Sequence, residues 1–240
     1  MDAFLTSEGL IALLTLTLLE IVLGIDNIIF ISIISNKLPE PDQTKSRNIG
    51  LFLALIFRIG LLSGISIIIG MTSTLFTVFD FAVSGRDLIL LAGGLFLLAK
   101  STSEIHGKIE GDLAEKASKK RGAVTLGKII LQIVLLDLVF SFDSILTAIG
   151  LSDDLPIMIT AIIISMIVMM LFAGRISRFI NRYPSLQILA LSFLILIGFM
   201  LILDGFGIHV PKEYIYFAVA FSLLVELINI KVRKKATNKQ

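Results

Sequence analysis

Two apolar segments of this chain carry the same short pattern of acidic and small polar residues. Residues 19–29 read LEIVLGIDNII and residues 136–146 read LDLVFSFDSIL, so each segment has an acid, five residues, a second acid and then a small polar residue. An offset of 117 residues pairs Glu20 with Asp137, Asp26 with Asp143, and Asn27 with Ser144. Carboxylate, amide and hydroxyl oxygens suit Mg²⁺, Ca²⁺ and Mn²⁺, so these six residues are the candidate metal ligands.

The same offset of 117 residues relates two arginines, Arg58 in IFRIG and Arg175 in FAGRI. A charge at the centre of a lone membrane helix costs at least about 2.5–3.5 kcal/mol, so acids placed there must bind a cation, be protonated or pair with a base. Two arginines cannot neutralise four acids. We therefore expect Arg58 and Arg175 to be charge-pairing or gating partners of a cation pathway. The alternative is that the ion pairs only hold the helices together.

The composition places these residues in a membrane protein. The 240 residues are 56% hydrophobic and 17% charged, and the mean hydropathy is +0.96, whereas a soluble domain is about 45–50% apolar. The absence of cysteine excludes disulfides and thiolate metal sites, and two histidines are too few for an imidazole zinc cage. Because the sequence has no zinc-protease motif, Ser–His pair or glycine-rich nucleotide loop, we expect no enzyme activity, no cofactor and no nucleic-acid partner.

The predicted fold class is an all-α membrane protein with seven transmembrane helices. A helix needs about 20 mainly apolar residues to cross a bilayer. The candidate spans are residues 11–34, 49–71, 88–99, 126–150, 157–173, 186–203 and 214–230. Their connections place 18 of the 21 Lys and Arg residues on one side and only Arg86 and Lys212 on the other, with Arg58 inside a span. By the positive-inside rule this asymmetry predicts a multi-pass cell-membrane protein with an outside N-terminus and a cytoplasmic C-terminus.

Three spans followed by three spans of opposite direction indicate an inverted repeat, an arrangement found in secondary transporters. We expect one transmembrane domain over residues 1–240. Its parts are repeat 1 (about 10–106), a cytoplasmic loop (about 101–125), repeat 2 (about 126–204) and a closing helix (about 213–230). The third spans of the two repeats share only an Leu–Ala pattern, at a different offset.

The predicted orientation arranges the acids as a ladder across the membrane. Glu20 and Asp137 lie near the middle of their spans. Asp26 is about 9 Å closer to the cytoplasm and Asp143 about 9 Å closer to the outside, at 1.5 Å per residue. The two acids of one motif are about 120° apart on a straight helix, so either they have different surroundings or the helix breaks. Gly24 could permit a break in the first motif.

Two further groups could bind a metal, but each has a simpler interpretation. His106 and Glu110 are spaced four residues apart, yet they lie in a charged stretch typical of a solvated loop. The span 157–173 contains a methionine patch, Met166, Met169 and Met170. Thioethers can bind soft metals, but methionine in an apolar span usually serves packing.

Four segments of the chain read LEIVLGIDNIIF, LLDLVFSFDSILTAIGLS, RDLILLAGGLFLLAKS and HVPKEYIYFAVAFSLLVE. These segments resemble the TerC family of integral membrane proteins, and the resemblance covers nearly the whole chain. The resemblance implies a role in metal-ion homeostasis, notably manganese export, and in tellurium resistance, with an architecture similar to the LysE superfamily. It also implies that the motif acids, with Asn27 and Ser144, bind the transported ion. Two alternatives stay open: a membrane assembly or secretion-helper protein with structural acids, and an exporter of a cationic amine. The sequence does not indicate an oligomeric state.

Overall fold

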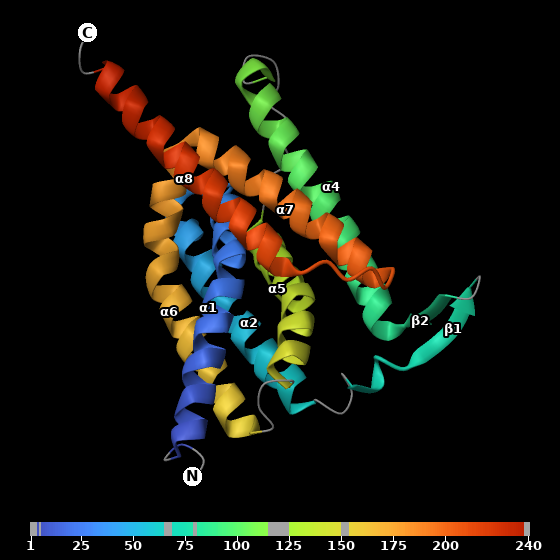
Figure 1. Cartoon of the computed structure of the whole chain (residues 1–240). Helices are drawn as coiled ribbons and strands as arrows, with labels where there is room; N and C mark the ends of the chain where they lie inside the picture. Colours follow the sequence, from blue (N-terminus) through green and yellow to red (C-terminus); the bar gives the residue numbers. More distant parts are fainter. Residues whose placement is uncertain are drawn as a thin grey trace. The chain divides into compact units, whose positions relative to one another are not determined.

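The structure, a computed structural model, describes residues 4, 6–64, 69–78, 81–114, 125–149 and 154–237 (Figure 1). Within these ranges seven helices are long and apolar enough to cross a membrane, which confirms the predicted fold class. The helices are α1 (Ser7–Ser35), α2 (Glu40–Ser63), α4 (Gly85–Ala114), α5 (Leu126–Ile149), α6 (Leu155–Asn181), α7 (Pro184–Gly205) and α8 (Lys212–Thr237).

Local sequence signals explain several helix ends. The Thr6 hydroxyl accepts a hydrogen bond of 3.0 Å from the Gly9 amide, and so caps the start of α1. Pro184 occupies the first position of α7, where its missing N–H has no cost. After α7 the chain turns at Gly207, whose φ of 74° is readily adopted only by glycine. Helix α1 runs unbroken through Gly24, so this glycine does not interrupt the first motif.

Two helices extend beyond the predicted spans into polar sequence. Helix α2 begins at Glu40 instead of residue 49 and ends at Ser63 instead of residue 71. Helix α4 continues through Ala114, so the expected loop at 101–125 is wrong for its first part. A hydropathy criterion detects only the part of a helix that lies in lipid, and α4 keeps forming backbone hydrogen bonds after its apolar section ends.

The segment between α2 and α4 contains a hairpin that the sequence analysis did not predict. Strand β1 (Thr74–Val78) pairs antiparallel with β2 (Phe81–Ser84), with Val78 opposite Phe81 (Figure 1). Strand β1 exposes two large apolar side chains, those of Leu75 and Phe76.

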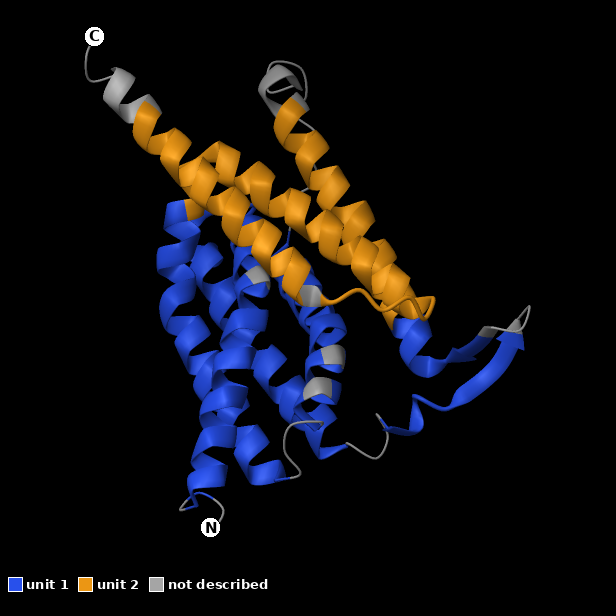
Figure 2. Cartoon of the chain, in the orientation of Figure 1, with its two compact units in different colours: residues 1–89, 120–179 blue, residues 90–119, 180–240 orange. Residues whose placement is uncertain are grey.

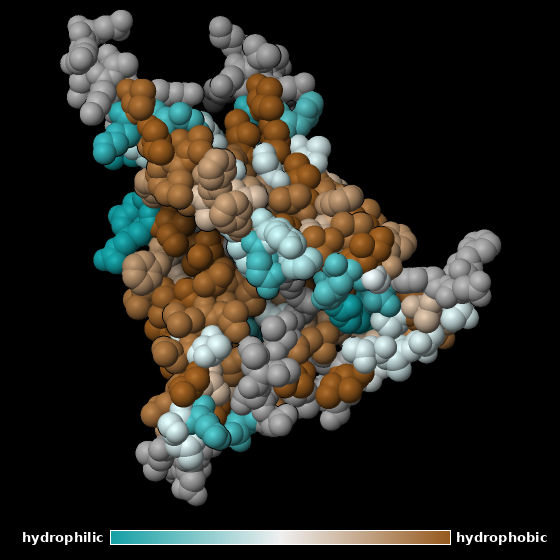
Figure 3. Space-filling model, viewed as in Figure 1, coloured by the Kyte–Doolittle hydropathy of each residue, from teal (hydrophilic) through white to brown (hydrophobic). Residues whose placement is uncertain are grey.

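The chain divides into two compact units, shown in different colours in Figure 2. The first, Met1–Ile89 with Lys120–Phe179, contains α1, α2, α5, α6 and the hairpin. In this unit α2 packs along α5, and α1 contacts both helices. A Cβ added to Gly50 of α2 would lie 2.7 Å from Ile133 Cγ2 of α5, so the packing depends on this glycine. On the face in Figure 3, apolar side chains cover most of the described helical surface, as expected for a protein surrounded by lipid.

The second unit, Leu90–Lys119 with Ile180–Gln240, contains most of α4 together with α7 and α8. Here α4 and α7 cross at Gly94 and Gly198. A Cβ on Gly94 would lie 2.5 Å from the Gly198 carbonyl oxygen, and one on Gly198 would lie 3.0 Å from the Gly94 carbonyl oxygen. The Cβ on Gly94 would also lie 3.1 Å from the backbone nitrogen of Ile202, and the Cβ on Gly198 would lie 3.2 Å from that of Leu98. The contact is reciprocal, and the two glycines are 104 residues apart rather than at the motif offset of 117.

Candidate functional site

The first unit brings one arginine and two motif acids together. Arg58 on α2 is 3% exposed, and its guanidinium reaches Glu20 on α1 and Asp137 on α5. Nε donates to Asp137 Oδ2 at 3.0 Å, and Nη2 donates to Asp137 Oδ1 at 2.9 Å. Nη1 donates to Glu20 Oε2. The paired bonds to Asp137 are the bidentate geometry that makes an Arg–carboxylate contact strong and directional.

Asp137 has further polar neighbours on α1 and α5. Ser141, one turn later on α5, places its Oγ 2.9 Å from Asp137 Oδ2. Asn27 on α1 donates from Nδ2 to Asp137 Oδ1 at 3.3 Å. Ser144 Oγ donates to the Ser141 carbonyl oxygen at 3.3 Å and so lies one step further along α5. The first and fourth spans therefore meet through the residues of the repeated motif.

The cluster of Glu20, Asp137 and Arg58 is buried and carries a formal charge of −1, from two carboxylates and one guanidinium. Glu20 is 4% exposed and Asp137 is 2% exposed. A buried ion pair loses several kcal/mol per ion in hydration, about balanced by attraction when the geometry is good. The second carboxylate remains in excess of the single arginine, so the cluster attracts additional positive charge.

Two buried oxygens near the cluster have no hydrogen-bond partner among the described residues: Thr17 Oγ1 and Asn27 Oδ1. Both residues lie on α1, and positions 17, 20, 24 and 27 share one face because they are three or four residues apart. Thr17 is therefore one turn before Glu20, and Asn27 is about two turns after it. Burying an unpaired polar atom costs about 1–3 kcal/mol, which makes these oxygens candidate ligands.

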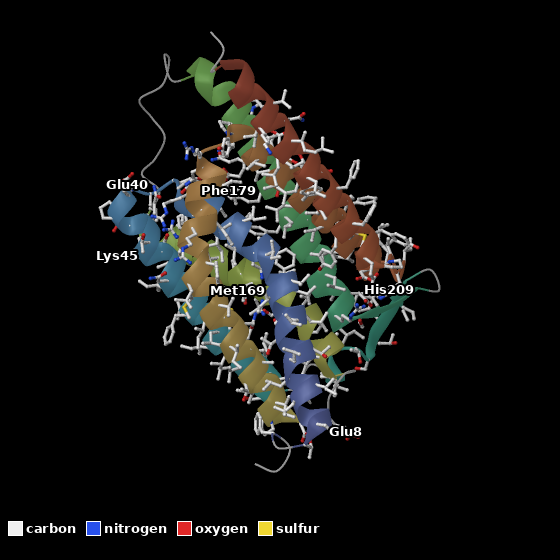
Figure 4. All side chains as sticks on the ribbon, turned by 60° about the vertical axis from the view of Figure 1, so that its left-hand side comes forward. Glu8, Glu40, Lys45, Met169, Phe179 and His209 are labelled. Carbon is white, nitrogen blue, oxygen red and sulfur yellow. The ribbon has the colours of Figure 1, made fainter. Side chains whose placement is uncertain are left out.

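The same face of α1 meets a methionine. Gly24 has no side chain, and a Cβ added to it would overlap Met169 Sδ of α6 and lie 3.2 Å from Met169 Cε. Figure 4 shows Met169 on α6 where this helix passes α1. Gly24 therefore allows the close approach of α6, a role different from the helix break considered from the sequence.

The remaining predicted site residues are placed as follows. The side chains of Asp26 and Asp143 lie outside the described part of the chain, as does that of Glu110. Arg175 does not join the cluster: it is exposed, and its Cζ lies 5.7 Å from the centre of the Phe172 ring. His106 is exposed on the extended part of α4.

The described residues contain no group of three or more His, Cys, Asp or Glu side chains that could hold a metal ion. The donors that do meet are two carboxylates with an amide oxygen and hydroxyls, which are hard ligands. Sequence reasoning missed Thr17, although its position three residues before Glu20 places it on the same helix face. It also treated Met169 as packing, because one sequence cannot show what a methionine in an apolar span contacts.

Comparison with known proteins gives a consistent result over nearly the whole chain. Residues 5–240 match the family described as integral membrane protein TerC family. The chain is 53% identical over 225 residues to the UPF0053 inner membrane protein YgdQ of Escherichia coli K12, with 94% of each chain covered. It is 50% identical over 227 residues to a UPF0053 protein of Haemophilus influenzae, with 95% of each covered. The UPF0053 inner membrane protein YoaE of Escherichia coli K12 is 48% identical over 222 residues, which cover 92% of this chain but 43% of YoaE. No solved structure matches.

Proposed function

Because the chain belongs to the TerC family of integral membrane proteins, we propose that it is a membrane transporter that exports a hard divalent metal cation, with Mn²⁺ as its main substrate. The observation that carries the proposal is the buried cluster of Glu20, Asp137 and Arg58, with its excess negative charge. The family resemblance supplies the metal and the direction of transport.

The charges of the cluster suggest how a cation binds and leaves. With Arg58 in place the formal charge is −1, and with a divalent cation in its place the charge is zero. With neither, two carboxylates would remain buried and unpaired at a charge of −2, which is the costly state. Arginine stays protonated and repels a metal ion. Arg58 therefore acts as an internal substitute that holds the empty site together and withdraws when the metal enters.

The motif's second acids complete the pathway in this proposal. Asp26 is about one and two-thirds turns beyond Glu20 on α1, and Asp143 is the same distance beyond Asp137 on α5. With the N-terminus outside, Asp26 serves the cytoplasmic approach and Asp143 the outer exit. Each acid lowers the barrier for a cation that has left water.

The test is flux of radiolabelled Mn²⁺ in proteoliposomes containing the wild-type protein, Asp137→Asn or Asp204→Asn. Asp204 is a suitable control because it is also a buried acid of a membrane helix, 5% exposed, but belongs to the second unit. We expect flux from wild type and Asp204→Asn, and none from Asp137→Asn at equal incorporation. If the wild type moves no Mn²⁺ or other divalent metal, the transporter proposal is wrong. The assembly-protein alternative then becomes the better explanation.

One observation favours a second candidate, an exporter of a cationic amine. The carboxylates already hold a guanidinium in bidentate geometry, and a substrate guanidinium or ammonium group would fit the same atoms. Adding unlabelled arginine, lysine or putrescine to the Mn²⁺ flux assay separates the candidates. A metal exporter is not inhibited by these amines, whereas an amine exporter is inhibited and transports the labelled amine itself.

A further inference from the structure

Met169 packs against α1 at Gly24, on the helix face that also carries Glu20 and Asn27. It is 1% exposed, and its sulfur occupies the space next to the bare Cα of Gly24. Gly24 lies one turn after Glu20 and one turn before Asn27, on the face that carries both residues. The sulfur is therefore at the level of Gly24, which lies between Glu20 and Asn27 along α1.

Asn27 is held in the cluster by one end of its amide only. Nδ2 donates to Asp137 Oδ1 at 3.3 Å, which directs the side chain into the cluster. Its Oδ1 accepts no hydrogen bond from the part of the chain that the structure describes, although Asn27 is 1% exposed. A buried amide oxygen without a donor is a candidate cation ligand, because an unpaired buried acceptor is otherwise destabilising.

The sulfur of Met169 distinguishes it from an aliphatic residue of similar volume. An aliphatic side chain would fill the space next to Gly24 equally well. Beside its three buried methionines (Met158, Met166 and Met169), the described part of α6 buries five aliphatic residues: Ile157, Ala161, Ile162, Ala173 and Ile180. A thioether differs from them in being a soft, weak metal ligand. Mg²⁺ and Ca²⁺ take oxygen ligands almost exclusively, whereas affinity for sites with N or S ligands rises along the divalent transition metals from Mn²⁺ onward.

We propose that Met169 and Asn27 determine the metal selectivity of the site. Sδ and Oδ1 join the two carboxylates and give the cation a mixed soft and hard environment. This environment favours divalent transition metals over Mg²⁺ and Ca²⁺. The inference rests on the proposed transport of a divalent metal, and names its substrate class.

The test compares Met169→Leu with Met166→Leu. Leucine conserves volume and removes the sulfur, and such exchanges usually cost under about 1.5 kcal/mol. Met166 is a matched control, since it is fully buried on the same helix one turn earlier. In proteoliposomes, inhibition of labelled Mn²⁺ flux by Mg²⁺ and by Ca²⁺ gives the selectivity of each variant. We expect wild type and Met166→Leu to prefer Mn²⁺, and Met169→Leu to lose that preference through weaker Mn²⁺ affinity.

A second variant displaces the same sulfur through a change on α1. It keeps the proposal testable if Met169→Leu does not fold. Gly24→Ala adds a Cβ that overlaps Met169 Sδ, so the flexible thioether must move away from its place beside α1. We expect Gly24→Ala to reduce the preference for Mn²⁺ as Met169→Leu does.

The outcomes separate this inference from the proposed function. If wild type transports Mn²⁺ without discriminating against Mg²⁺ and Ca²⁺, or if folded Met169→Leu and Gly24→Ala both keep the wild-type preference, the selectivity role is overturned and the transport function stands. If the wild type transports no divalent metal, both are wrong.

Discussion

Replacing Arg58 with glutamine removes the internal positive charge from the cluster. Three hydrogen bonds to Glu20 and Asp137 disappear, and the formal charge changes from −1 to −2. Removing one partner of a buried ion pair costs about 3–5 kcal/mol, because the remaining charge is left uncompensated. In metal-free detergent solution the variant should therefore be much less stable than the wild type.

A divalent cation should reverse this loss. In the wild type the metal must first displace the guanidinium, whereas in Arg58→Gln it enters a site that already lacks its countercharge. The difference of about 3–5 kcal/mol sets a ceiling of about 10²- to 4 × 10³-fold on how much tighter the variant can bind, since each 1.4 kcal/mol is tenfold. Turnover should fall despite the tighter binding, because nothing replaces the metal when it leaves.

The assay is thermal unfolding with chelator and with increasing Mn²⁺, beside flux in proteoliposomes. Binding to the folded state alone stabilises by about 2.7 kcal/mol at a ligand concentration one hundred times Kd. Arg47→Gln is the matched control: Arg47 lies on the same helix and is 8% exposed, but its guanidinium contacts the hydroxyls of Ser177 and Thr44. The reasoning is refuted if folded Arg58→Gln binds Mn²⁺ more weakly than wild type, or if Mn²⁺ stabilises the two arginine variants equally.

Three further predictions come from the sequence and the structure together. Asp26→Asn and Asp143→Asn should each abolish Mn²⁺ flux while the protein still inserts in the membrane, and normal flux at matched expression would remove these acids from the pathway. Gly94→Ala should destabilise the second unit by about 1–3 kcal/mol, since overpacking forces backbone shifts. The control Gly60→Ala should be neutral or slightly stabilising, because nothing lies within 4 Å of the new Cβ. Equal thermal unfolding of the two variants would contradict the tight crossing of α4 and α7. A cysteine introduced near Asp2 should react with an impermeant reagent on intact cells and one near Thr237 should not, and the opposite labelling would reverse the proposed orientation.

The sequence predicted the seven helices because apolar length is a strong and local signal. It missed the parts of helices that lie in polar sequence, where the apolar signal is absent. The polar end of α4 is held by its own backbone hydrogen bonds, and the start of α2 at Glu40 lies in charged sequence. The hairpin was missed because the residues joining its strands, Phe79 and Asp80, are not the Asn-Gly or Asp-Gly pair that marks a tight turn.

The site was partly predictable for a related reason. The repeat identified Glu20, Asp137 and Arg58 as equivalent or paired positions, and the structure brings them together. It also suggested a symmetric role for Arg175, which the structure places on an exposed part of α6 near its cytoplasmic end in the proposed orientation. An internal repeat constrains the backbone more strongly than it constrains individual side chains. Contacts between helices far apart in the chain, such as that of Met169 with Gly24, are not encoded in any local pattern.

A structure of the protein determined at saturating Mn²⁺, with anomalous scattering to locate the metal, tests the central claim most directly. We predict an Mn²⁺ peak between the carboxylates of Glu20 and Asp137, with the Arg58 guanidinium displaced from both. If Arg58 keeps its bidentate bonds to Asp137 at saturating Mn²⁺, and no metal lies between the two carboxylates, the proposed exchange of arginine for metal does not occur.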